Sequence, residues 1–395
     1  MTITRRRWLG AAALLTFART ARAASWQQTL QAARGQTVYF DAWAGSERIN
    51  AYLQWAAAEL ERTRGLRLEH VKIADTAEAV QRIRTEKAAG RSEGSIDMVW
   101  INGENFLHLK REALLYGPFA ETLPSYAWVD TVGKPTTRID FSEPVEGMEA
   151  PWGMAQLTFY ADRKRVAQPP LSAAELLAWT GANAGRFSYP KPPQFHGTTF
   201  LKQLLLELAP ARAPLQAPVT DAAFARTGAP LWAYLERLHP KLWRDGRQFP
   251  ANNVVMRQML ADGELAIGLT FNPNEAANEI AAGRLPQSVY SYQHRGGTIG
   301  NTHFLAIPFN ARAKAGAQVA IDFLLSPQAQ ARKADIAEWG DPTVLAVERL
   351  PAAERALFAA TRVAGSVLQP APALPEPHAS WVEPLEREWT RRYGV

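Results

Sequence analysis

The sequence contains no cysteine, and this absence excludes several kinds of chemistry. Without cysteine a chain forms no disulfide, offers no thiolate to a metal ion, has no cysteine nucleophile and cannot carry a lipid on an N-terminal cysteine. The sequence also has no uninterrupted apolar run near the roughly 18 residues that a membrane-spanning helix needs. We therefore expect a protein with neither a lipid anchor nor a membrane span.

Several catalytic and cofactor motifs are missing as well. There is no P-loop, no His-Glu-x-x-His zinc motif and no Gly-x-Gly-x-x-Gly dinucleotide motif, and the seven histidines include no close pair at helical metal-ligand spacing. One hydrolase-like pattern, Gly-x-Ser-x-Gly, contains Ser92, but it follows a predicted helix and precedes a predicted strand. A hydrolase nucleophile elbow has the reverse order. We expect no catalytic residue, no metal and no cofactor, with a serine hydrolase using Ser92 as the alternative.

Residues 1–23 have the composition of a bacterial export signal. Arg5, Arg6 and Arg7 precede a short apolar stretch, and residues 21–23 have the Ala-x-Ala form of a cleavage site. A twin-arginine signal has similar parts to a Sec signal, so both routes stay open. Removing the five arginines of this segment would lower the formal charge from +6 to about +1. The basic composition therefore predicts no binding to nucleic acid.

The remaining chain is long enough, and at 47% hydrophobic residues apolar enough, for two or three domains with large cores. Strand-like segments at 37–43, 66–73 and 96–101 alternate with helical patterns at 48–62 and 76–89. This alternation is typical of a parallel sheet with crossover helices. In such sheets ligands bind beyond the carboxyl ends of the strands.

Polar and aromatic side chains gather at those expected strand ends. Ser46 is the predicted N-cap of the helix at 48–62, and tryptophan rings there can stack on a flat solute or hold a cation. Each tryptophan can equally pack within its own lobe. The candidate ligand-binding residues in this half of the chain are Trp43, Ser46, Trp100, Asn102, Glu104 and Asn105.

A second ligand-facing corner is expected around residues 186–208. A strand-like start leads into a proline-rich turn, and then His196, Gly197, Thr198 and Thr199 begin a helical pattern, with a threonine as the expected cap. The free amides and dipole of such a helix start favour an anion or a polar ligand group. An ordinary capped helix without ligand contact is the structural alternative.

The same pattern recurs later in the chain. A predicted strand at 265–270 leads to Asn272 and Asn274, at the start of a helix that reaches residue 282. A strand at 302–309 and a helical stretch at 317–336 follow. We therefore add Asn272 and Asn274 to the candidate ligand-binding residues.

Several phrases along the chain resemble one protein family. They are the Pro-Trp-Gly-x-x-Gln-x-x-x-Tyr strand at 151–160, the strand at 301–310, the Leu-Ser-Pro-x-x-Gln phrase within 321–330, and the segments 97–105 and 187–199. Together with the export signal they are similar to periplasmic solute-binding proteins of ABC importers, of the YnjB-like, family 1 type. The resemblance extends over nearly all of the mature chain.

The resemblance implies an α/β, two-lobed periplasmic-binding-protein fold of type II. Each lobe would be a mainly parallel sheet flanked by helices, and crossing strands near 157–161 and 298–304 would join the lobes. Lobe 1 would comprise 24–157 and 301–346, and lobe 2 would comprise 158–300. The sequence does not assign residues 347–395 to one lobe. We expect them to return to lobe 2.

The resemblance also implies a function and partners. A small solute would bind in the cleft between the lobes, and closure would present it to an ABC permease in the inner membrane. The protein would be a periplasmic monomer. From the crossing strand we add Trp152 and Gln156 as candidate ligand contacts.

The charge of the solute stays open at this point. Glu104 favours a cation, whereas the helix starts favour an anion, so a thiamine-like compound or another small organic ion with both features would satisfy both signals. An oxyanion is the competing choice. A ferric ion is another, because Tyr290, Tyr292 and His294 alternate on a predicted strand, although the adjacent tyrosines of ferric-binding relatives are missing.

Overall fold

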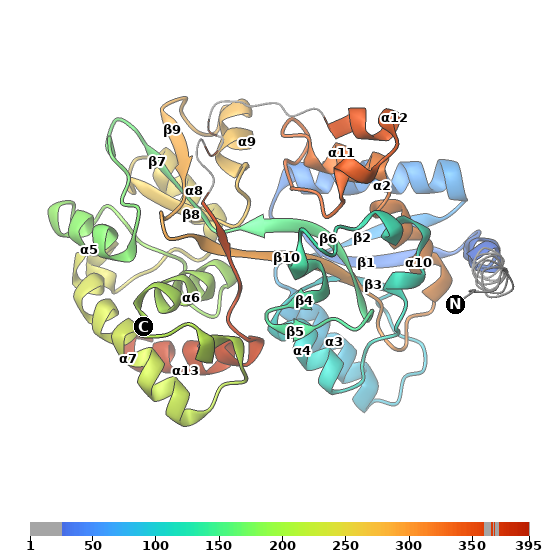
Figure 1. Cartoon of the computed structure of the whole chain (residues 1–395), viewed down its shortest axis with the longest axis horizontal. Coiled ribbons are helices and arrows are strands. Elements are labelled where there is room, and N and C mark those ends of the chain that lie inside the picture. Colours follow the sequence, from blue (N-terminus) through green and yellow to red (C-terminus); the bar gives the residue numbers. More distant parts are fainter. Residues whose placement is uncertain (1–25, 359–364, 366, 368–370, 395) are drawn as a thin grey trace, which may run out of the picture.

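A computed structural model describes residues 26–358, 365, 367 and 371–394. The expected export signal at 1–23 lies outside the described residues. Two lobes lie side by side, and two long strands, β6 (Glu149–Gln156) and β10 (Thr298–Ala306), run between them (Figure 1). The two-lobed α/β fold expected from the sequence is confirmed.

Lobe 1 is built on a sheet in the strand order β11-β10-β3-β1-β2, with β6 also paired to β10. Strand β1 (Thr37–Trp43) is parallel to β2 (Arg67–Ile73) and to β3 (Met98–Ile101), as the alternating pattern predicts. Strand β10 is antiparallel to both β3 and β6, so the sheet is mixed. Helix α2 lies on one side of this sheet and α3 and α4 on the other (Figure 1).

Amphipathic helices cover this sheet because each buries one apolar stripe. Leu53, Ala56 and Leu60 of α2 are fully or almost fully buried, and so is Ile83 of α3. The helices of lobe 1 are α2 (Glu47–Arg64), α3 (Thr76–Ala88), α4 (Glu104–Arg111), α10 (Lys314–Leu324), α11 (Pro327–Ala334) and α12 (Ala352–Arg355).

Lobe 2 contains a smaller sheet in the order β8-β7-β9. Strand β7 (Thr158–Asp162) is antiparallel to both β8 (Ile267–Thr270) and β9 (Val289–Tyr292). The expectation of a mainly parallel sheet is therefore wrong for this lobe, because β7, which follows directly after the crossing strand β6, is the central strand and runs against both neighbours. Its helices are α5 (Ala173–Ala182), α6 (Phe195–Leu208), α7 (Asp221–Leu238), α8 (Asn253–Ala261), α9 (Glu275–Ala281) and α13 (Val382–Tyr393).

The end of the chain packs against lobe 2. Trp381, Leu385 and Trp389 belong to the same apolar cluster as Leu157, Phe200 and the rest of the lobe 2 core. The short strand β11 (Ala373–Leu374) pairs with the start of β10. Residues nearer to 347 behave differently, since Val347, Leu350 and Phe358 pack against the lobe 1 core.

Two other expected elements differ in the structure. The strand-like stretch at 186–190 has no strand ladder, and its residues 187–190 are buried. The Ala266 amide holds it in part by donating to the Arg186 carbonyl. The helical stretch at 317–336 is two helices, because Pro327 cannot donate the bond that would continue α10 and instead begins α11 behind the Ser326 cap. Small elements complete the chain: β4 (Ile139–Asp140), β5 (Glu143–Pro144) and nine short 3-10 turns among the described residues.

Candidate functional site

One cavity of about 490 Å³ is lined by residues from both lobes. Its lobe 1 wall is formed by the ends of β1 and β3 and by the starts of α3 and α4. Ligands of parallel sheets bind at these positions. Its lobe 2 wall is formed by the start of α6, the turn between β8 and α9, and the helix α13. A solute in this cavity would contact both lobes at once.

Three tryptophans line the lobe 1 wall, namely Trp43, Trp100 and Trp339. The rings of Trp100 and Trp339 are 5.8 Å apart in an edge-on arrangement. The Trp43 indole lies directly over Gly45, where any β-carbon would collide with the ring. Gly45 therefore permits the orientation of Trp43, and the sequence predicted Trp43 and Trp100 but missed Trp339.

Polar groups at the starts of two helices line the same wall. Asp75 caps α3 through a reciprocal capping box with Glu78, so its carboxylate already accepts from the Ala77 amide at 2.9 Å. Asn102 and Asn105 also line the cavity, and between them Gly103, with a positive φ of 65°, turns the chain from β3 into α4. This turn places Glu104, the first residue of α4, at the cavity.

The lobe 2 wall begins with the residues before and within the first turn of α6. Gln194 is the N-cap, and its Oε1 accepts from the amides of His196 at 2.8 Å and Gly197 at 3.3 Å. Phe195 and His196 line the cavity, and burial lowers the pKa of His196 to about 4, which keeps its ring neutral at pH 7. Because a side chain already satisfies these amides, the start of α6 has less capacity for an anion than the sequence suggested.

Aromatic and acidic side chains complete this wall. Phe271 and Asn272 follow β8, and Phe271 stacks edge-on with Phe195 at 5.3 Å. Glu275 lines the cavity from α9, but Arg257 binds it at 2.7 Å. Pattern reasoning missed Phe271 and Phe195 as aromatic walls, although each directly neighbours a residue that it selected.

Two carboxylates face the cavity from different lobes. Glu104 belongs to α4, and Glu386 belongs to α13, where its Oε1 accepts a bond of 2.6 Å from the Thr198 hydroxyl. Burial raises the pKa of Glu104. Burial, together with repulsion from Glu104, raises the pKa of Glu386 to about 7. Glu386 was missed because it lies 188 residues from its partner Thr198 in sequence and follows no strand.

A buried charged cluster supports the base of the cavity. His303 Nε2 lies 2.9 Å from Asp341 Oδ2, and Lys333 binds the same carboxylate. Burial opposes ionisation of Asp341, but His303 and Lys333 outweigh it and lower the pKa of the carboxyl. Burial lowers the pKa of Lys333. His303 and Asp341 both line the cavity, and neither was among the residues expected from the sequence.

Half of the fourteen predicted ligand-binding residues line this cavity: Trp43, Trp100, Asn102, Glu104, Asn105, His196 and Asn272. The other seven, Ser46, Trp152, Gln156, Gly197, Thr198, Thr199 and Asn274, are not among its lining residues. Ser46 precedes α2 as expected but its side chain makes no cap bond.

The remaining six have structural contacts instead. Trp152 is fully buried, with its ring 5.1 Å from Trp100 and 5.2 Å from Trp339, so it supports the wall from behind. Gln156 bonds to Thr298 at 3.1 Å between the crossing strands. Helix α6 begins before Thr198 and Thr199, so neither caps it; both are buried in its interior with Gly197. Asn274 Nδ2 donates to the Gly340 carbonyl at 2.6 Å.

Two other constellations from the sequence lie elsewhere. Tyr290 and Tyr292 are buried in the lobe 2 core, where the Tyr290 hydroxyl donates to the Val166 carbonyl at 2.7 Å, and His294 pairs with Glu207 at 2.6 Å. Ser92 is exposed in the bend between α3 and β3, so its surroundings are not those of a nucleophile elbow.

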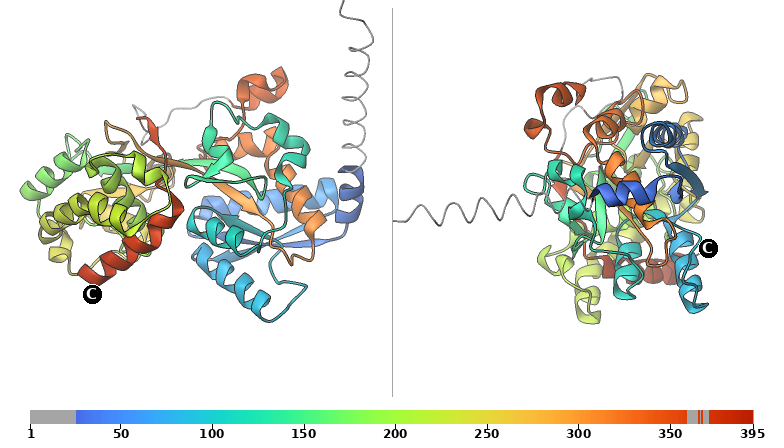
Figure 2. Two further views of the ribbon diagram at one scale, coloured as in Figure 1. Left: turned by 60° about the horizontal axis from the view of Figure 1, so that its bottom comes forward. Right: turned by 90° about the vertical axis from the view of Figure 1, so that its right-hand side faces the viewer.

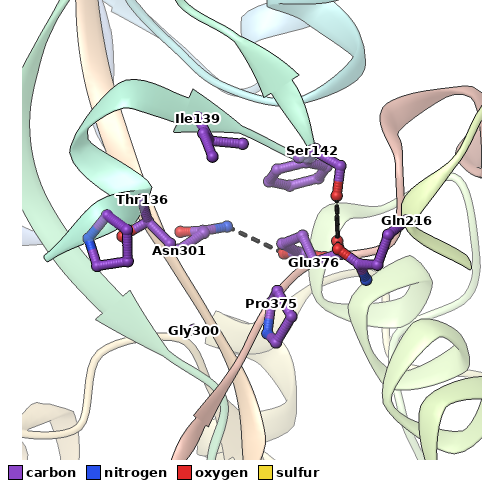
Figure 3. A pocket seen from close by; sticks show the side chains of 10 residues that line it. Thr136, Ile139, Ser142, Gln216, Gly300, Asn301, Pro375 and Glu376 are labelled. Atoms are coloured by element: carbon purple, nitrogen blue, oxygen red, sulfur yellow. Dashed lines mark hydrogen bonds between the residues drawn. The ribbon is translucent and has the colours of Figure 1, made fainter. Parts of the chain in front are cut away.

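A second, smaller cavity of about 240 Å³ adjoins the crossing strands (Figure 3). Its polar side chains bond to one another: Asn301 donates to Glu376 at 3.0 Å, and Ser142 donates to Gln216 at 2.8 Å. Lys202 pairs with Glu376 at 2.8 Å behind it. Asn301 and Ser142 belong to lobe 1, Gln216 and Lys202 to lobe 2, and Glu376 to the C-terminal segment. These bonds therefore connect both lobes and the C-terminal segment, so we regard this cavity as part of the hinge.

Two features are absent from the described residues. No group of three or more His, Cys, Asp or Glu residues among them is arranged to hold a metal ion. In the same part of the chain no helix has the length and apolar character to cross a membrane.

Comparison with known proteins places this geometry in a family. A sequence model described as bacterial extracellular solute-binding protein matches residues 54–354. Protein YnjB of Escherichia coli (strain K12) is 49% identical over 383 residues, which is 97% of each chain.

Similar solved structures share the fold at low sequence identity. The periplasmic binding protein AfuA of Actinobacillus pleuropneumoniae, with fructose-6-phosphate bound, has a TM-score of 0.65 at 13% identity and covers 91% of this chain and 99% of its own. Iron-bound HitA of Pseudomonas aeruginosa has a TM-score of 0.60 at 16% identity, with 89% and 98% covered. The two-lobed fold and the cavity between the lobes agree with these matches, which extend over most of the chain. This chain belongs to the bacterial extracellular solute-binding protein family, whose members serve ABC importers.

Proposed function

We propose that the protein binds one small solute in the cavity between its lobes and delivers it to an ABC permease in the inner membrane. The observation that carries this proposal is the cavity of about 490 Å³ with walls from both lobes. A solute that contacts both walls stabilises the closed form, because only that form makes both sets of contacts. The permease then recognises the closed form.

The walls favour a small organic ion with a flat or cationic portion. Trp43, Trp100, Phe195 and Phe271 supply aromatic faces, and Glu104 supplies a carboxylate. A thiamine-like compound has the matching features. An oxyanion is supported less well, because Gln194 occupies the first amides of α6.

A ferric ion is also supported less well. Tyr290 and Tyr292 make core contacts in lobe 2 and are not among the lining residues of the cavity. Iron sites need several hard oxygen or imidazole donors that converge on one point. HitA is similar in fold alone, so its iron says nothing of the cargo of this chain.

We further propose a periplasmic monomer in which lobe 1 comprises 24–157 and 301–346 and lobe 2 comprises 158–300. The packing of Trp381 and Trp389 supports assigning the end of the chain to lobe 2. The composition of residues 1–23 supports export by the Tat or Sec route, and the absence of cysteine supports a form without a lipid anchor. A receptor of this kind has no catalytic residue and needs no cofactor.

Mass spectrometry of the purified chain under native conditions tests the receptor function. We expect a small molecule to remain bound at one per chain and to be released when the chain is unfolded. Excess of that molecule at about 100 times its Kd should stabilise the fold by about 2.7 kcal/mol. Ester hydrolysis that is lost in Ser92→Ala, without any retained solute, would instead support the hydrolase alternative.

A further inference from the structure

Basic groups at or near the cavity are paired, whereas two of its acidic groups form no ion pair among the described residues, and this difference limits the charge of the solute. Four basic side chains at or near the cavity already have an acidic partner: Arg84 binds Glu112, Arg257 binds Glu275 at 2.7 Å, Lys202 binds Glu376 at 2.8 Å, and Lys333 binds Asp341. Glu104 and Glu386 have no ion-pair partner among the described residues. The cavity therefore contains two acidic groups that no ion pair compensates in the part of the chain that the structure describes.

These two carboxylates come from different lobes but from adjacent elements. Leu107 of α4 packs in one apolar cluster with Ala379, in the short turn before α13, and Val382, the first residue of α13. This contact brings α4 and the start of α13 together, and Glu104 of α4 and Glu386 of α13 both line the cavity. Helix α13 lies on the side of lobe 2 that faces lobe 1 (Figure 2).

The surroundings of Glu386 fix its carboxylate in this position. Thr198 of α6 donates to it at 2.6 Å, while Glu104 of α4 and Asp75 at the start of α3 repel it. Lys202 of α6 attracts it but is committed to Glu376. Removing charges from water and leaving them unpaired is costly, so this arrangement is stable only when protons or a bound cation compensate it.

We propose that Glu104 and Glu386 hold the positively charged group of the solute between them, so that the protein selects organic cations over anions and neutral solutes. This inference rests on the proposed receptor function. Trp43, Trp100 and Phe271 surround the same space with aromatic faces, which also attract a cation. Because one carboxylate comes from each lobe, the cation bridges the lobes and its binding favours closure.

Titration calorimetry of the whole chain tests the assignment, with thiamine as an aromatic cation, putrescine as a non-aromatic cation, and phosphate and citrate as anions. We expect binding of a cation and not of the anions. Glu104→Gln and Glu386→Gln should each weaken cation binding about 10- to 100-fold, the loss expected when a charged hydrogen bond is removed. Glu383→Gln is the matched control, because Glu383 lies on the same helix, 76% exposed.

Melting curves distinguish a role of Glu104 and Glu386 in solute binding from a role in stabilising the fold. The two Gln variants remove mutually repelling charges, so their melting temperatures at pH 8 without ligand should equal or exceed that of the parent chain. A merely structural Glu386, which anchors α13 to α6 through Thr198, would instead melt lower as Gln. Glu386→Asp keeps the charge and should retain more cation affinity than Glu386→Gln.

Proton release gives a readout that a structural role would not change. The pKa of Glu386 near 7 means that part of the ligand-free protein is protonated there at pH 7, and a bound cation favours the ionised form. Cation binding should release a proton near pH 7 and tighten as the pH rises through 7. Calorimetry in buffers of different ionisation enthalpy measures this release, which should be lost in Glu386→Gln.

Two results would overturn the inference. One is that the best-binding probe carries no positive charge, in which case the receptor function stands and the charge assignment fails. The other is that both Gln variants bind the cation as tightly as the parent chain. If native mass spectrometry finds no retained molecule and no probe binds, the proposed function fails and this inference fails with it.

Discussion

Two tryptophans that were both predicted at the cleft have different roles. Both Trp43 and Trp152 were expected at the cleft, the first from a strand end and the second from a Pro-Trp-Gly turn. Trp43 lines the cavity, whereas Trp152 is fully buried in strand β6 behind Trp100. The expectation for Trp152 is wrong as to direct contact, because β6 turns that side chain into the lobe 1 core.

This difference gives opposite expectations for the two alanine variants. Trp152→Ala should lower the free energy of unfolding by about 3–5 kcal/mol, the cost of emptying a large buried site. Trp43→Ala should leave stability closer to the parent value but weaken solute binding roughly 3- to 30-fold, as expected for loss of an aromatic contact to a cation. Urea unfolding and calorimetry measure the two quantities. Equal loss of stability in both variants would place Trp43 in the core as well.

The charges of Asp341 and Lys333 depend on each other. Both side chains are buried, and Asp341 also binds His303 at 2.9 Å. Asp341→Asn should destabilise the fold by about 3–5 kcal/mol, because it leaves a buried ammonium without its partner. Adding Lys333→Met should recover most of this loss. Chemical denaturation of the single and double variants tests the coupling, which is absent if the two effects simply add.

Helix α6 shows how a local cap decides what a helix start can bind. The sequence suggested a threonine cap with free amides, but α6 begins at Phe195 and the Gln194 side chain accepts from two of its first amides. Gly197 lies inside the first turn against the preceding loop, where a β-carbon would collide with the Pro190 carbonyl oxygen. Gly197 therefore allows the proline-rich loop to fold back onto the helix.

Substitution at this glycine should be costly. Gly197→Ala must displace the 190–194 loop, so we expect a loss of about 1–3 kcal/mol of stability, as for other overpacked sites. Weaker solute binding should accompany it, since Phe195 and His196 would move with the loop. Gly296→Ala is the matched control, because open space surrounds that position. A similar melting temperature for both variants would contradict the proposed close packing.

Contacts between the lobes also occur outside the solute cavity. Asn278 of α9 donates to the Trp339 carbonyl at 2.5 Å, and Asn274 donates to Gly340, so lobe 2 binds the loop that carries Trp339. Arg284 forms a 3.0 Å ion pair with Glu47 at the start of α2. This pair is exposed and contributes little, whereas the amide bonds act on a loop that also lines the cavity.

Removal of one such bond should shift the balance between open and closed forms. Asn278→Ala should weaken solute binding mainly through faster release, because the closed form loses a contact while each wall stays intact. Asn183→Ala is the control, since that side chain bonds only to the Trp179 carbonyl of its own helix α5. Stopped-flow fluorescence with the retained solute measures the release rates. Equal rates in the two variants would show that this bond does not contribute to closure.

Local patterns were sufficient for much of the fold and for half of the candidate site. The alternation of strands and helices in residues 37–111, the caps, and the phrases shared with the family all act over short stretches of chain, so they predicted elements and the two-lobed α/β fold. They also placed Trp43, Trp100, Asn102, Glu104 and Asn105, because the carboxyl ends of parallel strands meet at one edge.

Only the tertiary structure decided the rest. The antiparallel sheet of lobe 2, the burial of Trp152 and the contribution of Glu386 all depend on which distant segments pack together, and no local periodicity encodes this. Glu386 reaches the cavity because Trp381, Leu385 and Trp389 bind the lobe 2 core. Residue types along the chain determined the kinds of chemistry that are possible, and long-range packing determined which of those side chains face the solute.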